Sequence, residues 1–255
     1  MTVFSQIRQD RSADEVAHQI EGLILEGVLR SGDQLPGERE LAVETGVSRP
    51  VVREAIELME ARGLLQKRHG EGTFVCDIIG QVFSEPIAAL LPHHHKATRD
   101  YLEYRREIEA IAAGMAAERA THYDREMLMR CVERMKRAHE RQDFAEEARA
   151  DLELHSLLGE MTHNLVLLHT LRACYRLLSE GIFQNRSRFY EKTGARQSLL
   201  DQHLAIANAV LAGDRAGAMQ AARDHVSYVM EKSLELDGDL ERERIAALRY
   251  RKRAG

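Results

Sequence analysis

The sequence predicts a mostly α-helical protein, with an N-terminal winged helix-turn-helix of mixed α and β structure followed by a C-terminal all-α bundle. Residues 34–76 contain two helical repeats, a glycine turn between them and a hairpin pattern bounded by glycines. From residue 99 to residue 236 the apolar residues keep helical spacing, with few helix breakers and no strand-like alternation. The 255 residues are 44% hydrophobic and 30% charged, which supports two modest domains with separate cores.

Composition limits the class of protein further. No segment reaches the roughly 18 consecutive apolar residues of a membrane-spanning helix, and the N-terminus MTVFSQIRQDRS lacks the apolar core of a signal peptide, so we expect a cytoplasmic protein. Three widely spaced cysteines, an odd number without a CxxC pair, favour reduced thiols over a disulfide framework. The net charge of −5 gives nucleic-acid binding no support, so any attraction to DNA must come from local clusters of basic residues.

The first elements predicted are two helices separated by a turn. An apolar stripe from Asp14 to Leu29 predicts a helix that Ser12 can cap, and the turn cluster at 30–33 precedes a brief strand at Gln34-Leu35. A second helix opens after Pro36 and reaches Thr45. Gly46 ends it, because a tight turn between helices commonly needs a residue that tolerates positive φ.

The third helix carries the residues that point to DNA. Ser48 is a suitable N-cap, and Val52, Ala55, Ile56 and Met59 form its inward stripe. Arg49 and Arg53 lie one turn apart near its start, where a recognition helix presents guanidinium groups to O6 and N7 of guanine. The alternative is that both arginines are solvated and paired with Glu54 or Glu57. The surrounding helix-turn-helix favours the DNA interpretation.

Residues 64–75 predict the wing. Two short strands, 64–68 and 73–75, flank His69-Gly70-Glu71-Gly72. We expect the tip, with His69 and Gly70, to lie along phosphate or enter the minor groove, and Lys67 and Arg68 to contact phosphate. His69 is otherwise an ordinary exposed loop histidine.

Residues 77–97 predict a linker with one short helix over 82–91. The run His93-His94-His95 invites a metal assignment, but adjacent side chains point in different directions, so a solvated linker is the better interpretation.

The remaining chain predicts six helices and a charged tail. The helices are expected at 99–121, 124–141, 144–161, 165–192, 197–212 and 215–236. The tail at 237–255 ends in the basic stretch RYRKRAG and can continue a helix before fraying. Such a basic end could contact DNA phosphate, but a solvated terminus is the better interpretation.

One carboxylate and three histidines on these helices form a candidate metal site: Asp151, His155, His203 and His225. Asp151 and His155 are four residues apart and share a helical face, while the other two histidines have apolar neighbours on later helices. Buried polar groups need partners, and a divalent Zn, Ni or Mn ion would satisfy all four with positions left for water or a ligand. Spacing alone leaves open that the four residues are independently hydrogen-bonded.

The motifs LPGERELA, VSRPVVREAI and RHGEGTFV agree in order and spacing with the DNA-binding head of GntR-family bacterial regulators, so residues 10–76 resemble that head. The resemblance implies a homodimer on a short inverted-repeat operator. It also implies base or phosphate contacts at Arg39, Arg49, Arg53, His69 and Gly70, and Ser48 belongs to the same expected surface.

Residues 98–235 resemble the FCD ligand-binding domain of the FadR subfamily. The resemblance places Asp151, His155, His203 and His225 at metal-ligand positions, and Arg105 and Asn164 at effector-binding positions. It implies that a small carboxylate completes the coordination of the metal while Arg105 binds the anion. The alternative for Arg105 is an i,i+4 pair with Glu109.

These observations predict a repressor without catalytic residues, whose operator affinity depends on a 2-oxo or 2-hydroxy acid such as pyruvate, lactate or glycolate. We expect residues 1–76 to be the DNA-binding domain, 77–97 the linker, 98–236 the effector domain and 237–255 the tail. A repressor that responds to the metal ion itself is one alternative. A metal-dependent enzyme fused to a DNA-binding head is another.

Overall fold

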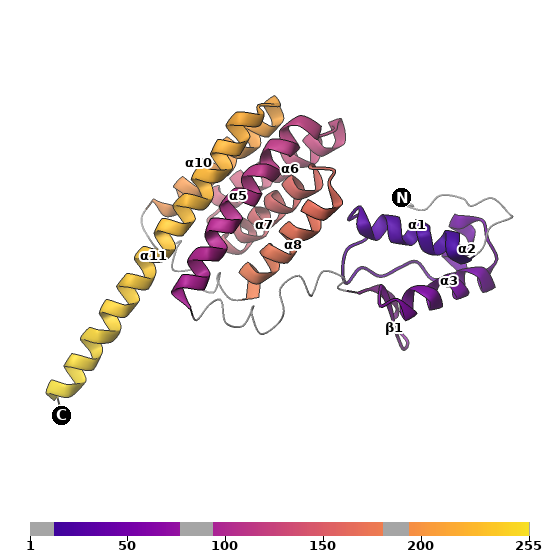
Figure 1. The fold of residues 1–255 in the computed structure, drawn as a ribbon, viewed down its shortest axis with the longest axis horizontal. Helices are drawn as coiled ribbons and strands as arrows, with labels where there is room; N and C mark the ends of the chain where they lie inside the picture. Colours follow the sequence, from indigo (N-terminus) through magenta and orange to yellow (C-terminus); the bar gives the residue numbers. More distant parts are fainter. Residues whose placement is uncertain (1–12, 77–93, 181–193, 255) are drawn as a thin grey trace. The chain divides into compact units, whose positions relative to one another are not determined.

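A computed structural model describes residues 13–76, 94–180 and 194–254 of the chain. The chain divides into two compact units, Met1–Val82 and Phe83–Gly255, and each unit has its own apolar core (Figure 1). The predicted linker helix at 82–91 and His93 of the histidine run lie outside the described residues, whereas His94 and His95 stand at the start of α5 (His95–Arg119). In the described parts, no helix is long and apolar enough to cross a membrane.

The described residues of the first unit form three helices and a hairpin, which confirms the predicted winged helix-turn-helix. The helices are α1 (Ala13–Leu25), α2 (Glu38–Thr45) and α3 (Arg49–Ala61), and the strands are β1 (Leu65–Arg68) and β2 (Gly72–Val75). Both α1 and α2 pack against α3. Their inward stripes form one apolar core, whose fully buried members include Val16, Ile20, Leu41, Ile56 and Met59.

The turn between α2 and α3 follows from Gly46. Its φ of 75° lies in the left-handed region, and its N–H donates to the carbonyl of Ala42 to close α2. Ser48 occupies the N-cap position of α3, but its side chain makes no capping hydrogen bond. Ser48 is exposed at the start of this helix.

The wing is an antiparallel hairpin in which Leu65 pairs with Val75 and Arg68 with Gly72. The brief strand expected at 34–35 appears as a single bridge from Gln34 to Phe74, so it lies beside β2. Leu65 and Val75 are buried in the core of the unit, and this anchors the base of the wing while residues 69–71 form its exposed tip.

The second unit is an all-α bundle, as predicted, and Figure 1 shows α5 lying along α11. Its described helices are α5 (His95–Arg119), α6 (His122–Glu140), α7 (Phe144–Glu160), α8 (Leu165–Glu180), α10 (Ala195–Ala212) and α11 (Arg215–Ala254). Small residues let α5 approach α11 closely: a Cβ added at Gly114 would lie 2.6 Å from Cγ of Met219. The last helix continues to Ala254, beyond the residue 236 expected for the bundle helix, so the tail does continue it.

Capping residues fix where these helices begin. Thr121 and Asp124 form a reciprocal capping box at the start of α6, in which the hydroxyl of Thr121 accepts from the N–H of Asp124. Asp143 caps α7 by accepting from the N–H of Glu146. The start of α7 at residue 144 is as predicted. Helix α6 begins at His122, two residues before its predicted start at 124.

Candidate DNA-binding surface and metal centre

The outward face of α3 exposes Arg49 and Arg53, while its inward face is buried. Arg53 is paired, but across helices: its Nη2 lies 2.9 Å from Oε2 of Glu38 on α2, and not against Glu54 or Glu57 as the alternative expected. The hydrogen bond from Arg53, opposed by burial, lowers the pKa of Glu38. The pair links the two helices of the helix-turn-helix and leaves half of the Arg53 side chain exposed, at 54%.

Other predicted contacts also lie at the surface of this unit. Arg39, Ser48, His69 and Gly70 are all exposed. Gly70 has a φ of 77°, a conformation that is strained for residues with a side chain, so the turn at the wing tip favours glycine there.

The basic residues of β1 are held by neighbours. Nζ of Lys67 lies 3.6 Å from Oε2 of Glu60 on α3, whereas the guanidinium carbon of Arg68 stacks 4.4 Å from the centre of the Phe74 ring. Both side chains remain exposed. Their partners restrict both side chains but leave them accessible to a phosphate group.

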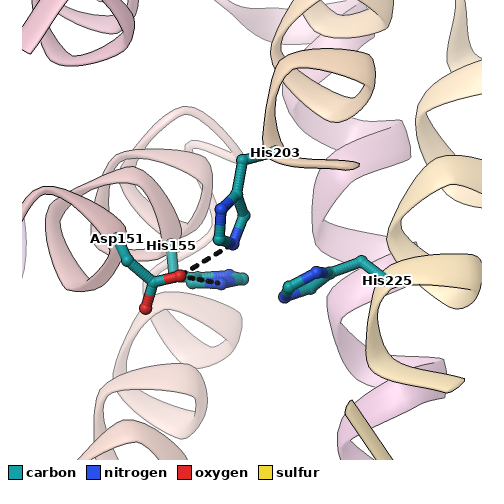
Figure 2. A group of neighbouring side chains, drawn as sticks. All are labelled: Asp151, His155, His203 and His225. Carbon is teal, nitrogen blue, oxygen red and sulfur yellow. Dashed lines mark ion pairs between the residues drawn. The ribbon is translucent and has the colours of Figure 1, made fainter. Parts of the chain in front are cut away.

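The bundle brings Asp151, His155, His203 and His225 together, as Figure 2 shows. Asp151 and His155 come from α7, His203 from α10 and His225 from α11. One ligand atom from each lies within 4.8 Å of all the others, and every one of the four residues is at most 3% exposed. Residues far apart in the sequence therefore converge in the bundle core.

Contacts inside the cluster suit a cation. Oδ1 of Asp151 lies 2.7 Å from Nε2 of His203 and 3.7 Å from Nε2 of His155 (Figure 2). Nε2 of His155 is buried and makes no hydrogen bond to any described residue. Three imidazole nitrogens and one carboxylate oxygen form an established donor set for Zn²⁺ and similar ions, so these residues fit a divalent metal.

Two further residues orient the histidines. Oε2 of Glu109, on α5, lies 3.0 Å from Nδ1 of His155, and Nδ1 of His225 donates to Oε1 of Gln202 over 3.1 Å. Each contact leaves the Nε2 atom for the cluster. Burial, together with the neighbouring imidazoles, lowers the pKa of His225 well below its ordinary value, so its ring is neutral, as a metal ligand must be.

Arg105 lies beside this cluster in the interior of the bundle. It is 1% exposed, and its Nε donates to Oε1 of Glu109, so the i,i+4 pair expected as an alternative is present. Its Nη1 is buried without a hydrogen-bond partner among the described residues. Burial opposes the charge of Glu109, but Arg105 and His155 outweigh it and hold the pKa of Glu109 below its ordinary range.

The Tyr175 ring joins Arg105 to the histidines. Its centre lies 5.8 Å from the guanidinium carbon of Arg105 and 5.4 Å from the His155 ring. Tyr101 lies nearby on α5, and its hydroxyl donates to the carbonyl of Cys174. The Tyr175 ring thus lies close to both the buried arginine and a histidine of the cluster.

Asn164, which the resemblance placed at the effector site, and two ionisable residues close to the site in sequence are engaged in other contacts. Asn164 is exposed, and its side-chain oxygen accepts from the N–H of Leu167, which gives it a capping role at α8. His163 pairs with Asp124, and Glu153 pairs with Arg134. Glu153 is therefore not placed as a general base for a metal-bound water.

Sequence reasoning did not assign Glu109, Gln202, Tyr101 or Tyr175 to the site. The sequence could have indicated Glu109, because it lies four residues after Arg105 and residues four apart share one face of a helix. Gln202 precedes His203 but contacts His225 from another helix. Residue spacing in the sequence cannot predict a contact between two different helices.

An exposed arginine helix beside a β wing, joined in one chain to a helical domain with a buried polar cluster, defines a DNA-binding protein of the winged helix-turn-helix class with a second regulatory domain. Residues 12–75 match bacterial regulatory proteins of the gntR family, and residues 100–228 match the FCD domain. The chain belongs to the GntR family of transcriptional regulators, in its FCD-containing FadR subfamily. This is a family of regulators and not of enzymes, which removes the enzyme alternative.

Curated relatives cover nearly the whole chain. The "Putative L-lactate dehydrogenase operon regulatory protein" of Escherichia coli (strain K12) is 36% identical over 90% of this chain and 89% of its own length. The Glc operon transcriptional activator of the same strain is 32% identical over 88% of this chain and 90% of its own length. The solved structure of Streptococcus agalactiae GntR, at 23% identity and a TM-score of 0.52, covers 86% of this chain and 99% of that one, and shows the fold alone.

One finer resemblance is not supported. The stretches SQIRQ, ILEGVLRSGDQLPGERELA and HNLVLLHTLR resemble the pyruvate dehydrogenase complex repressor, which favoured that protein as the nearest relative. The named relatives are instead regulators of L-lactate dehydrogenase and Glc operons.

Proposed function

We propose that this regulator is a repressor whose affinity for its operator is controlled by a small monocarboxylate, a 2-oxo or 2-hydroxy acid, bound at a divalent metal in the FCD domain. The observation that carries the proposal is the buried convergence of Asp151, His155, His203 and His225 next to the partly unpartnered guanidinium of Arg105. A protein that acts on a DNA operator works in the cytoplasm.

The four clustered residues would hold the metal, and the bound ion would supply a positive centre for a carboxylate oxygen. The donor set accepts Zn²⁺, Ni²⁺ and Mn²⁺. Asp151 carries the only charge among the four ligands, while Gln202 and Glu109 keep two of the imidazoles directed at the ion.

The charges buried around the cluster favour a singly charged acid. With neutral histidines, Asp151 and Glu109 together outweigh Arg105 by one negative charge. A divalent cation reverses this to one positive charge, which one monocarboxylate would neutralise. A dicarboxylate would leave an unbalanced charge in a medium that solvates charge poorly.

Arg105 provides the second contact for the acid. Its Nη1 has no partner among the described residues and is buried, so an incoming carboxylate oxygen would satisfy it with a charge-assisted hydrogen bond. Pyruvate, lactate and glycolate each pair a carboxylate with a neighbouring oxygen that could chelate the ion. One relative is named as a putative regulatory protein of an L-lactate dehydrogenase operon, so lactate is the first of these acids to test.

The DNA-binding surface consists of Arg39, Ser48, Arg49 and Arg53 around α3 and of Lys67, Arg68, His69 and Gly70 on the wing. Their common exposure on one small unit supports this assignment. A homodimer would place two such surfaces on the half-sites of an inverted repeat, because operator symmetry mirrors protein symmetry.

A thermal-shift experiment tests the effector site. The chain is stripped with chelator, reloaded with Zn²⁺, Ni²⁺ or Mn²⁺, and melted with L-lactate, pyruvate, glycolate, succinate or the neutral ester methyl lactate. Metal should raise Tm, and a monocarboxylate should raise it further while the ester does not, because a ligand that binds only the folded state stabilises it by about 2.7 kcal/mol at a hundred times Kd.

Matched variants separate the site from the rest of the bundle. His203→Ala should abolish both shifts, whereas His122→Ala, an exposed histidine on α6, should preserve them. Failure of every metal to bind, or equal shifts with acid and ester, would contradict the proposal.

A repressor that responds to the ion itself is the second candidate, because the cluster is complete without an acid. Operator binding is titrated with metal and then with acid at saturating metal. A change at the first step alone identifies the metal-responsive protein, and a change at the second supports the carboxylate-responsive one.

A further inference from the structure

Glu109 connects two parts of the proposed effector site. It projects from α5 and is 3% exposed, with one carboxylate oxygen on Nδ1 of His155 and the other on Nε of Arg105. One buried side chain therefore contacts a proposed metal ligand on α7, shown in Figure 2, and the proposed anion-binding arginine.

Its contact with His155 selects a tautomer. Because Oε2 of Glu109 lies 3.0 Å from Nδ1, its negative charge favours the tautomer with the proton on that nitrogen, and this tautomer leaves the lone pair of Nε2 for the cluster. The negative charge of Glu109 also makes the imidazole a stronger donor to a cation. Without this contact, the ring could rotate or place its proton on Nε2.

Its contact with Arg105 orients the guanidinium. Because Glu109 occupies Nε, the plane of the group is fixed and Nη1 is left buried and available. Arg105 is interior to the bundle, so its charge needs a nearby anion whether or not an acid is bound. Glu109 supplies that anion.

We propose that Glu109 is a positioning residue that sets the tautomer of His155 for the metal and, with the same carboxylate, holds Arg105 ready for the acid. The inference rests on the proposed function, since it concerns the same metal and acid. It predicts that a change at Glu109 weakens the binding of both, although Glu109 touches neither.

The experiment compares Glu109→Gln and Glu109→Asp with Glu107→Gln. Glutamine keeps the shape without the charge, and aspartate keeps the charge but is too short to reach both partners. Glu107 lies on the same helix but is exposed and paired with Arg106 and Arg223, so its variant is the matched control. Zn²⁺ dissociation constants come from chelator competition, and L-lactate constants from calorimetry on Zn²⁺-saturated protein.

We expect Glu109→Gln to weaken Zn²⁺ binding by about 10- to 100-fold, the usual effect of removing a partner of a metal ligand, and to weaken lactate binding as well. Glu109→Asp should fall between this variant and the wild type, and Glu107→Gln should match the wild type. Folded Glu109 variants with wild-type constants for both ligands would overturn the inference.

A measurement on the unaltered chain covers the case in which both Glu109 variants fail to fold. Long-range ¹⁵N–¹H NMR of the Zn²⁺-loaded wild type reports the tautomer of each histidine, and we expect His155 to carry its proton on Nδ1. A proton on Nε2, or metal on Nδ1, would overturn the inference. Failure of the wild type to bind Zn²⁺ would instead remove the proposed function.

Discussion

At the residue scale, Arg53 can bind either Glu38 of its own chain or a guanine base of DNA. In the free protein its guanidinium is bound by Glu38, whose pKa is lowered mainly by that hydrogen bond. A guanine edge would have to share or replace this carboxylate. Glu38 therefore restricts the Arg53 side chain in the free protein and reduces the conformational entropy that DNA binding must remove.

We predict that Arg49→Ala and Arg53→Ala each weaken binding to a selected operator by roughly 5- to 150-fold, the value of one lost base contact. Arg62→Ala is the control, because Arg62 is an exposed arginine at the end of the same helix, paired with Glu21. Fluorescence anisotropy against an operator obtained from randomised duplexes provides the constants. Equal affinity of all three variants would mean that α3 does not read bases.

The candidate site shows how far sequence reasoning reaches at this scale. Asp151 and His155 are one turn apart, so helical periodicity alone predicts that they share a face. His203 and His225 were added through their apolar neighbours and a family resemblance. Glu109 and Gln202 complete the site through contacts between helices, which depend on helix rotation and crossing that no local pattern encodes.

At the scale of elements, helix boundaries were predictable where a single residue marks them. Gly46 ends α2 and Asp143 caps the start of α7, and both are local signals. The last bundle helix was expected to end at residue 236, with a tail that could extend it. The helix continues to Ala254 because charged residues with good helix propensity need no apolar face to remain helical.

The capping box of α6 makes a prediction about pH. Burial would raise the pKa of Asp124, but hydrogen bonds from the side chain and backbone of Thr121, and from His163, lower it below the ordinary value of 3.8. Because the folded-state pKa is the lower one, the stabilisation is complete above the unfolded-state pKa and is lost as pH falls through the folded-state pKa.

Asp124→Asn should therefore lower the free energy of unfolding by about 1 kcal/mol near pH 7, a typical value for a helix cap, and by progressively less below about pH 4. Urea denaturation at several pH values measures the difference. Glu126→Gln changes an exposed pair on the same helix and should alter stability little at any pH. A deficit for Asp124→Asn that grows toward low pH would contradict this account.

The contact between α5 and α11 gives a second prediction for elements. Gly114 has no room for a side chain, since an added Cβ would lie 2.6 Å from Cγ and 3.0 Å from Sδ of Met219. Gly114→Leu should lower the free energy of unfolding by about 1–3 kcal/mol through overpacking, in spite of the better helix propensity of leucine.

Gly22 on α1 is the matched control, because nothing lies within 4 Å of a Cβ added there. Gly22→Ala should raise the stability of its own unit by up to about 1 kcal/mol. Thermal melts of both variants decide the matter, and a Gly114→Leu variant as stable as the wild type would show that Met219 moves aside at little cost.

At the scale of the whole molecule, DNA binding depends on placement of charge and not on its total. The chain carries a net charge of −5, yet the arginines and the wing lysine are exposed together on one small unit. We therefore expect phosphate contacts to be local and few. The steepness with which DNA affinity falls as salt rises should depend on the number of those phosphate contacts, and not on the overall charge of the chain.

Two sites on separate units can influence each other only through linked equilibria. If metal-bound lactate changes operator affinity by some factor, the operator must change lactate affinity by that same factor, and a coupling of about 1–3 kcal/mol corresponds to roughly 5- to 150-fold. We predict equal factors from two titrations of the Zn²⁺-loaded wild type, operator binding with and without lactate and lactate binding with and without operator. His203→Ala should give a factor of one in the first titration, because it removes a ligand of the proposed metal. A lactate effect on the operator that survives in this variant would mean that the acid acts from some place other than the buried cluster.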